Sequence, residues 1–285
     1  MTALAGSSDP GGRAIELEIV TRAHAALVWE ALTDPARIVE WFADRAQGEV
    51  TAGSTLTWSF DRLVSEMSFR VSPLTSTGRL VLEGEGGTPG HLEIRVGPAY
   101  DGTRITLLHG GLPETLAWED DFRALSAGWR LALAVLRYYV EFHYAEPRKG
   151  FFVIRSGRFP MARLQVLFRD PAGLQEWLTE GGSMGTPGGR VHLALKNGET
   201  MRGDMLADAG TDIAMAWDEI AGVIQIRTLP TAQRDVRSVC AMGWGWGLNG
   251  ERAKQIEQDL AIALERLERA AETSEAGQGA AYQSR

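Results

Sequence analysis

Two charged residues stand inside apolar, strand-like segments, where they can orient a bound molecule: Glu66 in SEMSFRV and Arg104 in TRITLL. Side chains alternate between the two faces of a strand, so Glu66 points into a cavity if Met67 and Phe69 point out of it. The opposite register fits the sequence nearly as well. A buried charge needs an opposite charge or a polar ligand group beside it. Glu66 and Arg104 are therefore candidate ligand-orienting residues, and surface ion pairs are the alternative.

Aromatic residues in the first half of the chain offer the apolar part of such a site. Aromatic rings give a large contact area to an apolar ligand, while a few polar groups fix its orientation. We expect the cavity to be lined by Trp41, Trp58, Phe60, Phe69, Trp118 and Trp129. The sequence does not single out a catalytic residue.

Two glycine motifs match the sequence patterns of known sites, but the elements expected around them do not match. GWGLNG at 245–250 fits the dinucleotide pattern G-x-G-x-x-G, yet the chain runs on into one helix and a polar tail instead of a further strand with an acidic residue. We interpret it as a strand-to-helix corner, with Trp244 and Trp246 on or near the cavity and Asn249 as a helix cap. GGSMG at 181–185 fits the nucleophile elbow, but its serine follows a helix and precedes a strand, so we expect a flexible loop.

The other residues that carry chemistry do not form a metal pattern. The histidines are scattered and Cys240 is the single cysteine, so we expect neither metal nor cofactor. His109 lies either near the cavity mouth or exposed at a strand end. The acidic run WEDD at 118–121 precedes a long helix and suits its positive N-terminal end better than a general-acid role.

An internal repeat organises the elements that must position these residues. LTDPARIVEWF at 32–42 reappears as FRDPAGLQEWL at 168–178. Asp34 and Asp170 are 136 positions apart (170 − 34), as are Trp41 and Trp177 (177 − 41). Asp as N-cap followed by Pro at the first helical position is a helix start. The spacing predicts two tandem copies, over 14–146 and 151–272, with a disordered tail over 273–285.

The first copy reads as one strand, two short helices, a run of antiparallel strands and one long helix, and the second copy follows with FPMARLQVLF, the capped helix, a similar run of strands and a long helix. Short turns between successive strands favour an antiparallel meander, so the fold class is α+β. We expect each sheet to bury one face under its closing helix. In the last helix Ile256, Leu260, Ala263, Leu267 and Ala271 form a single apolar stripe.

The first closing helix, over 124–142, carries a much wider apolar belt than the last one. Apolar residues cover most of its circumference, while Arg130, Arg137 and Glu141 form one narrow strip. A belt that wide implies a second burial partner. We expect this helix to contact both its own sheet and the other copy or a second chain, and joint exposure of Val135 and Tyr138 would refute this.

VWEALTDPARIVEWF at 28–42, the strand opening after Gly53 and the closing helix with Gly128-Trp129 resemble the START-like (SRPBCC) superfamily. The branch they resemble is the activator of heat shock protein ATPase (Aha-like) C-terminal domain. The resemblance is good up to about Phe142 and weak in the second copy. It implies two helix-grip domains, each a curved antiparallel sheet wrapped around a long C-terminal helix. A cavity for apolar molecules is then expected between the sheet and the helix. Family members bind ligands, bind partner proteins, or cyclise or hydrolyse a substrate, so the fold leaves the function open.

Composition narrows these options. The chain has 285 residues, 44% hydrophobic and 23% charged, and its net charge of −8 argues against nucleic acid or anionic membrane as partner. It has neither a signal-type apolar segment nor a spanning one, so we expect a cytoplasmic protein. We expect the first domain to bind a small apolar molecule or a protein partner without cofactor. A co-chaperone-type interaction module and a cyclase or hydrolase are the alternatives.

Overall fold

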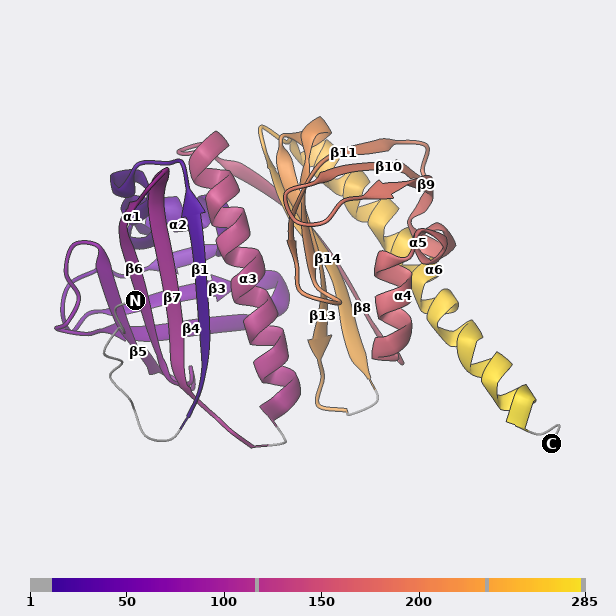
Figure 1. Cartoon of the computed structure of the whole chain (residues 1–285), viewed down its shortest axis with the longest axis horizontal. Coiled ribbons are helices and arrows are strands. Elements are labelled where there is room, and N and C mark those ends of the chain that lie inside the picture. The colour runs from indigo at the N-terminus through magenta and orange to yellow at the C-terminus, as the bar shows by residue number, and fades with distance from the viewer. Residues whose placement is uncertain (1–11, 116–117, 234–235, 283–285) are drawn as a thin grey trace. The chain divides into compact units, whose positions relative to one another are not determined.

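The computed structural model describes residues 12–115, 118–233 and 236–282, with side chains described up to residue 272 (Figure 1). The chain divides into two compact units. The first comprises residues 1–122 and 139–144, and the second comprises residues 123–138 and 145–285.

The first unit contains one antiparallel sheet of seven strands in the order β1-β7-β6-β5-β4-β3-β2. Strand β1 pairs with β7, the last strand of this unit in the sequence, and strands β2 to β7 form an antiparallel meander. Its elements are β1 (Arg13–Thr21), α1 (Ala25–Thr33), α2 (Pro35–Trp41), β2 (Arg45–Gln47), β3 (Thr55–Phe60), β4 (Ser65–Val71), β5 (Arg79–Glu85), β6 (His91–Ala99), β7 (Gly102–Leu112) and, shared with the second unit, α3 (Glu119–Phe142).

The second unit repeats this topology in the order β8-β14-β13-β12-β11-β10-β9. Its elements are β8 (Arg148–Gly157), α4 (Met161–Arg169), α5 (Pro171–Trp177), β9 (Thr179–Met184), β10 (Arg190–Leu195), β11 (Thr200–Asp208), β12 (Ile213–Trp217), β13 (Gly222–Pro230), β14 (Arg237–Trp246) and α6 (Gly250–Tyr282). The prediction of two tandem α+β helix-grip domains with antiparallel sheets is confirmed.

Two local predictions in the second unit are wrong. The segment 181–185, expected as a flexible loop, belongs mostly to strand β9, because its backbone pairs with β10 from Met184 to Thr179. The strand β8 was not predicted at all, although it pairs with β14 along its whole length. Its apolar run FFVI gave the available signal.

The repeated helix starts have the same hydrogen bonds in both units. The carboxylate of Asp34 accepts from the backbone N–H of Ala36 at 2.8 Å, and that of Asp170 accepts from Ala172 at 2.8 Å. Each Asp side chain satisfies one of the unpaired N–H groups of a helix start, and the following Pro has no N–H to leave unpaired. The predicted caps are confirmed.

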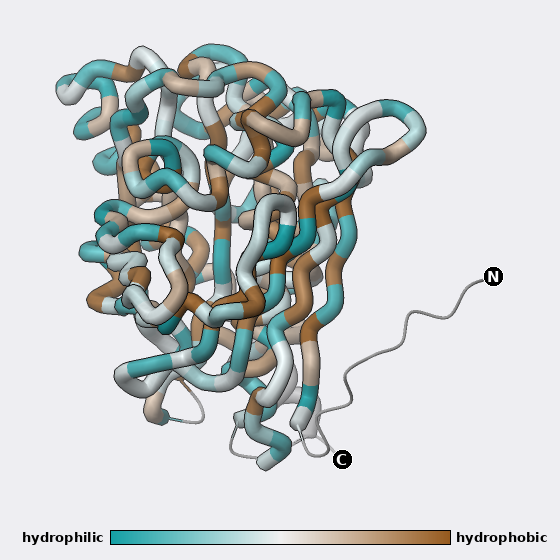
Figure 2. Tube along the Cα trace, turned by 90° about the vertical axis from the view of Figure 1, so that its left-hand side faces the viewer, coloured by the Kyte–Doolittle hydropathy of each residue, from teal (hydrophilic) through white to brown (hydrophobic). Residues whose placement is uncertain are grey.

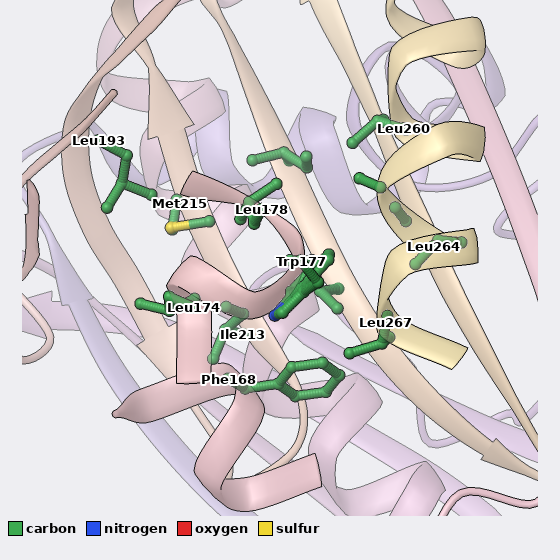
Figure 3. Packing of buried hydrophobic residues seen from close by; sticks show 14 of the residues in the cluster. Phe168, Leu174, Trp177, Leu178, Leu193, Ile213, Met215, Leu260, Leu264 and Leu267 are labelled. Carbon is green, nitrogen blue, oxygen red and sulfur yellow. The ribbon is translucent and has the colours of Figure 1, made fainter. Parts of the chain in front are cut away.

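The core of the second unit lies between its sheet, the helix pair α4–α5 and α6 (Figure 3). Leu260, Leu264 and Leu267 of α6 point toward Trp177 and its neighbours. The predicted stripe of α6 is confirmed, because all of its members are buried. α6 itself continues to Tyr282, so part of the predicted tail is drawn as helix; disorder over 273–285 stays a prediction, and residues 283–285 lie outside the described residues.

The sheet of the second unit buries both faces around β12, β13 and β14, which corrects the expectation of a single buried face there. Every residue of β12 is buried, including Ala214 and Ala216, which point away from the side of Met215 and α6. The reason is that residues 123–138 of α3 group with this unit. The guanidinium of Arg227 donates to the Ala124 carbonyl at 2.8 Å.

Helix α3 is buried around most of its circumference, as its wide apolar belt predicts. Val135 is fully buried and Tyr138 is half-buried, so the exposure that would have refuted a second burial partner does not occur. Tyr138 lies 6.0 Å from Trp246 between ring centroids. Toward its end, Tyr139 donates to Glu40 within the first unit.

Alternation along the strands is visible in Figure 2, where hydrophobic and hydrophilic residues follow one another along the strands nearest the viewer. It is strict in β10, where buried and exposed residues alternate from Arg190 to Leu195. One face of such a strand supplies the core and the other meets solvent.

No helix among the described residues has the length and apolar character needed to cross a membrane.

Candidate functional site

The first unit brings the predicted aromatic residues of its sheet together into one packed cluster. Phe42 lies at its centre, with ring centroids 5.0 Å from Trp41, 5.4 Å from Trp58 and 5.2 Å from Phe60. Trp58 in turn lies 5.3 Å from Phe69. The rings of Trp41 and Phe42 are stacked and the other pairs meet edge-on or tilted, as aromatic side chains do in cores. Phe42 was missing from the predicted set, although it ends the repeated motif.

The other two predicted aromatic residues lie elsewhere. Trp118 is half-buried at the start of α3, with its ring 6.4 Å from that of Phe122. Trp129 is buried, but it belongs to the part of α3 that groups with the second unit. The first turn of α3 carries the predicted acidic run, and Glu119 pairs with Arg13. The structural interpretation of that run is therefore the better one.

Glu66 and Arg104 are both exposed. Glu66 is exposed and accepts a hydrogen bond from Ser59 at 3.1 Å, whereas Phe69, on the opposite face of β4, is fully buried. Arg104 is half exposed and pairs with Glu18 at 3.2 Å. This corrects the register in which both would orient a ligand, because the apolar neighbours of Glu66 take the core side. For Arg104 the structure shows the surface ion pair that the sequence offered as the alternative.

His109 and Cys240 are the buried groups that could serve as a base or a nucleophile. His109 is fully buried beside Phe69, and its Nε2 lies 3.0 Å from the carbonyl oxygen of Pro89. Burial lowers the pKa of His109 and raises the pKa of Cys240 to about 11, so a neutral thiol is favoured. The described residues contain no cluster of His, Cys, Asp and Glu that could hold a metal ion.

A pocket of about 140 Å³ lies in the second unit, between α6 and one end of the sheet. Most of its lining is apolar, and the polar residues come from the 195–199 turn and from the outer positions of α6. The lining residues are Leu178, Leu195, Lys196, Asn197, Glu199, Met201, Trp217, Ile256, Asp259, Leu260, Ile262, Ala263 and Arg266.

Local backbone bonds fix the end of the pocket that faces the sheet. The N–H of Lys196 donates to the carbonyl of Leu178 at 3.0 Å, and the N–H of Leu195 donates to that of Glu199 at 2.8 Å. These bonds tie the end of α5 to the β10–β11 turn. On the other side, Ile256, Leu260 and Ala263 recur at helical spacing, so one face of α6 closes the pocket.

Trp217, at the end of β12, is supported from the sheet side by Phe151. The two rings meet edge to face with centroids 6.3 Å apart. Phe151 lies against Gly243, its partner on β14, where an added Cβ would come within 2.6 Å of the Phe151 ring. Glycine at 243 therefore leaves room for the ring that holds Trp217 in place.

The charged residues at the pocket rim are mostly paired. Glu199 accepts from Arg252 at 2.6 Å, and Lys196 lies 3.5 Å from Glu180. Asp259 accepts from the amide of Asn197 at 3.0 Å. The contacts of Glu199 and Asn197 hold the turn against α6, whereas Lys196 pairs with a residue of β9.

The pocket residues were not predicted as a site. The sequence offered two signals: the apolar stripe of α6 and a tryptophan at the end of the strand-like run IAMAW. Neither distinguishes a pocket from a filled core. The corner at 245–250 behaves as interpreted, because the Asn249 side chain caps α6 by accepting from the Arg252 N–H at 2.8 Å. Trp244 and Trp246, however, are not among the pocket residues.

Comparison with known proteins finds a family match within the first domain. Residues 22–141 match the model of the family described as Activator of Hsp90 ATPase homolog 1-like protein. The match falls on the part of the chain whose motifs predicted the resemblance. With a second unit of the same topology, the protein consists of two tandem domains of the START-like (SRPBCC) type.

Solved structures with a similar fold include two that span both units. DynU16, a protein of the dynemicin biosynthetic locus, is 20% identical over 90% of this chain and 98% of its own, with a TM-score of 0.41. BexL, a di-domain ARO/CYC, is 15% identical over 91% and 99%, with a TM-score of 0.40. The Aha1 dimer from Colwellia psychrerythraea is 19% identical over 45% and 96%, with a TM-score of 0.41. A search of curated proteins finds no match.

Proposed function

We propose that the protein binds a small, largely apolar molecule, and that the binding site is the pocket between α6 and the sheet of the second domain. The observation that carries this proposal is the pocket itself, with its apolar interior and paired polar rim. Ligand sites combine a mostly apolar lining with a few polar groups. The sequence-based expectation had placed the ligand in the first domain, where the aromatic rings instead pack on one another.

The volume limits what enters. Drug-sized ligands occupy pockets of roughly 300–1,000 Å³, whereas an apolar cavity of about 150 Å³ accommodates benzene. A pocket of about 140 Å³ therefore suits a single ring or a branched alkyl group, with the rest of a larger ligand outside. The paired rim charges favour binding over acid–base chemistry, which needs titratable groups within reach of the substrate.

Filling the pocket tests the proposal. Ala263 is buried and lines the pocket, so Ala263→Leu directs a larger side chain into it. Ala261 is half-buried on the same helix and does not line it, so Ala261→Leu is the matched control. Ethylbenzene should perturb NMR methyl signals of the wild type and of Ala261→Leu, and not of Ala263→Leu. Equal perturbation in all three proteins would refute the site.

A protein-interaction role is the second candidate, and the match of residues 22–141 to the activator family favours it. Native mass spectrometry of the purified protein separates the two. A retained small molecule that Ala263→Leu loses supports ligand binding. A stoichiometric protein partner retained by that variant supports the interaction role.

A further inference from the structure

Arg266 brings a positive charge to the second-domain pocket without a counter-ion of its own. It lines the pocket from α6 and is half-buried. Among the described residues, 12–115, 118–233 and 236–282, its guanidinium has neither an ion-pair nor a hydrogen-bond partner. An arginine side chain stays charged in proteins and presents five N–H donors in one plane. These donors are available to an anion.

The helix directs the Arg266 side chain over the pocket. In an α-helix each Cα–Cβ bond tilts toward the N-terminus, so a long side chain covers the preceding turn. For Arg266 that turn carries Ile262 and Ala263, and both line the pocket. Ile262 is 47% exposed, so this part of the lining meets solvent. A ligand that enters the pocket from solvent therefore passes the guanidinium.

The helix itself supplies no counter-ion for Arg266. On a helix surface, the residues three and four positions away are the neighbours that can form ion pairs. For Arg266 these neighbours are Ile262, Ala263, Arg269 and Ala270. None of them is acidic. The adjacent Glu265 faces Arg155 of β8, with 3.6 Å between its carboxylate and the guanidinium of Arg155.

Asp259 is the pocket acid that could repel an anion, since Glu199 pairs with Arg252. It stands seven positions before Arg266, which is about 10 Å along the helix axis. Its carboxylate accepts from Gln255, one turn further from Arg266, at 3.2 Å. A separation of about 10 Å is close to the screening length in physiological salt, so the repulsion at Arg266 is weak.

We propose that the pocket selects an amphipathic anion, a small monocarboxylate with an aryl or branched alkyl group, and that Arg266 binds its carboxylate. The apolar group enters the pocket, whose volume limits it to about one ring. The carboxylate matches the planar guanidinium and can form two parallel N–H···O bonds with it. This inference rests on the proposed function of the pocket and adds the charge of the ligand to it.

Phenylacetate and phenylacetamide form a matched probe pair, because they have nearly the same shape and only phenylacetate is charged. In NMR titrations at low salt, the wild type should bind phenylacetate about five-fold more tightly than phenylacetamide, as expected for a partly exposed ion pair. Arg266→Gln should remove this preference and change phenylacetamide binding less than about two-fold. Arg266→Lys keeps the charge and should retain part of the preference.

Arg269→Gln is the matched control. Arg269 is exposed on the same helix and does not line the pocket, so this variant removes an equal charge and should keep the preference. Salt gives a second readout, because raising it from about 0.02 M to about 0.5 M screens an exposed ion pair. Phenylacetate binding should weaken with salt in the wild type and not in Arg266→Gln, whereas phenylacetamide binding should not change with salt in either protein.

The remaining outcomes separate this inference from the proposed function. If the wild type binds ethylbenzene and does not prefer phenylacetate, or if the preference survives in Arg266→Gln, the anion role is overturned and the pocket remains a ligand site. An equal loss of both probes in Arg266→Gln makes Arg266 a packing residue and overturns the role as well. If no probe binds the wild type, or if Ala263→Leu binds phenylacetate as the wild type does, both proposals fall.

Discussion

Trp177 and Leu167 are joined by a hydrogen bond from the indole Nε1 to the backbone carbonyl over 2.8 Å, deep in the second domain. Trp41 and Ala31 form the same bond over 2.9 Å in the first. In both domains the bond ties the end of one short helix to the preceding helix. The repeat thus preserves a specific side-chain contact as well as a chain topology.

Replacing Trp177 by Phe should destabilise the second domain by about 2 kcal/mol, because the variant loses the indole bond and leaves the Leu167 carbonyl without this donor. Trp217→Phe should cost less, since the Nε1 of Trp217 has no partner among the described residues. Urea denaturation followed by circular dichroism compares the two. A larger loss for Trp217→Phe would contradict the difference in hydrogen bonding.

The two aspartate caps should contribute equally. Asp34→Ala and Asp170→Ala each remove one bond to a helix N-terminal N–H, which costs about 1 kcal/mol. Asp→Asn at either position keeps a capping oxygen and should restore most of the stability. Thermal unfolding of the four variants checks this, and an Asn variant as unstable as the Ala variant would show that capping is not the cause.

Gly243→Ala should destabilise the second domain by about 1–3 kcal/mol, since its Cβ would lie 2.6 Å from the Phe151 ring and 2.1 Å from the Val223 carbonyl oxygen. The displaced ring would also loosen Trp217. Gly150→Ala is the control on the neighbouring strand, where the nearest atom would be 3.5 Å away. Similar chemical denaturation midpoints for both variants would argue against the steric role of Gly243.

Acid should destabilise the first domain through His109. Burial lowers its pKa in the folded state below the ordinary value of about 6.5. The unfolded chain then binds the proton more readily, so this contribution is complete above about pH 6.5 and is lost as the pH falls through the folded pKa. Urea midpoints from pH 7.5 down to 5 should fall, and less steeply in His109→Gln. An unchanged slope in the variant would assign the acid sensitivity to other groups.

The fold was largely predictable because its signals are local. The constant spacing between the two Asp-Pro helix starts, and the strand-like runs between Gly and Pro, specify repeated elements without knowledge of their packing. Strand β8 escaped because its flanks lack a repeated motif, and β9 escaped because its glycines read as a loop. Pairing with a neighbouring strand overrode that local preference.

The candidate site was not predictable to the same degree. For Glu66 the sequence allowed two registers that differ by one residue, and burial of Phe69 on the same strand shows which of them the structure adopts. Filled core and ligand pocket use the same apolar residue types. Only the packing of side chains separates the aromatic cluster around Phe42 from the space beside Trp217.

The sequence by itself determined the repeat, the helix caps, the antiparallel plan and the apolar stripe of α6, since each depends on neighbours along the chain. Tertiary structure alone decided where the pocket beside α6 lies, which charges meet solvent and which buried indole N–H groups have a partner among the described residues. Those properties depend on how side-chain volumes and hydrogen-bond partners from distant segments of the chain combine in space. The periodicity of residue types along the chain does not contain this information.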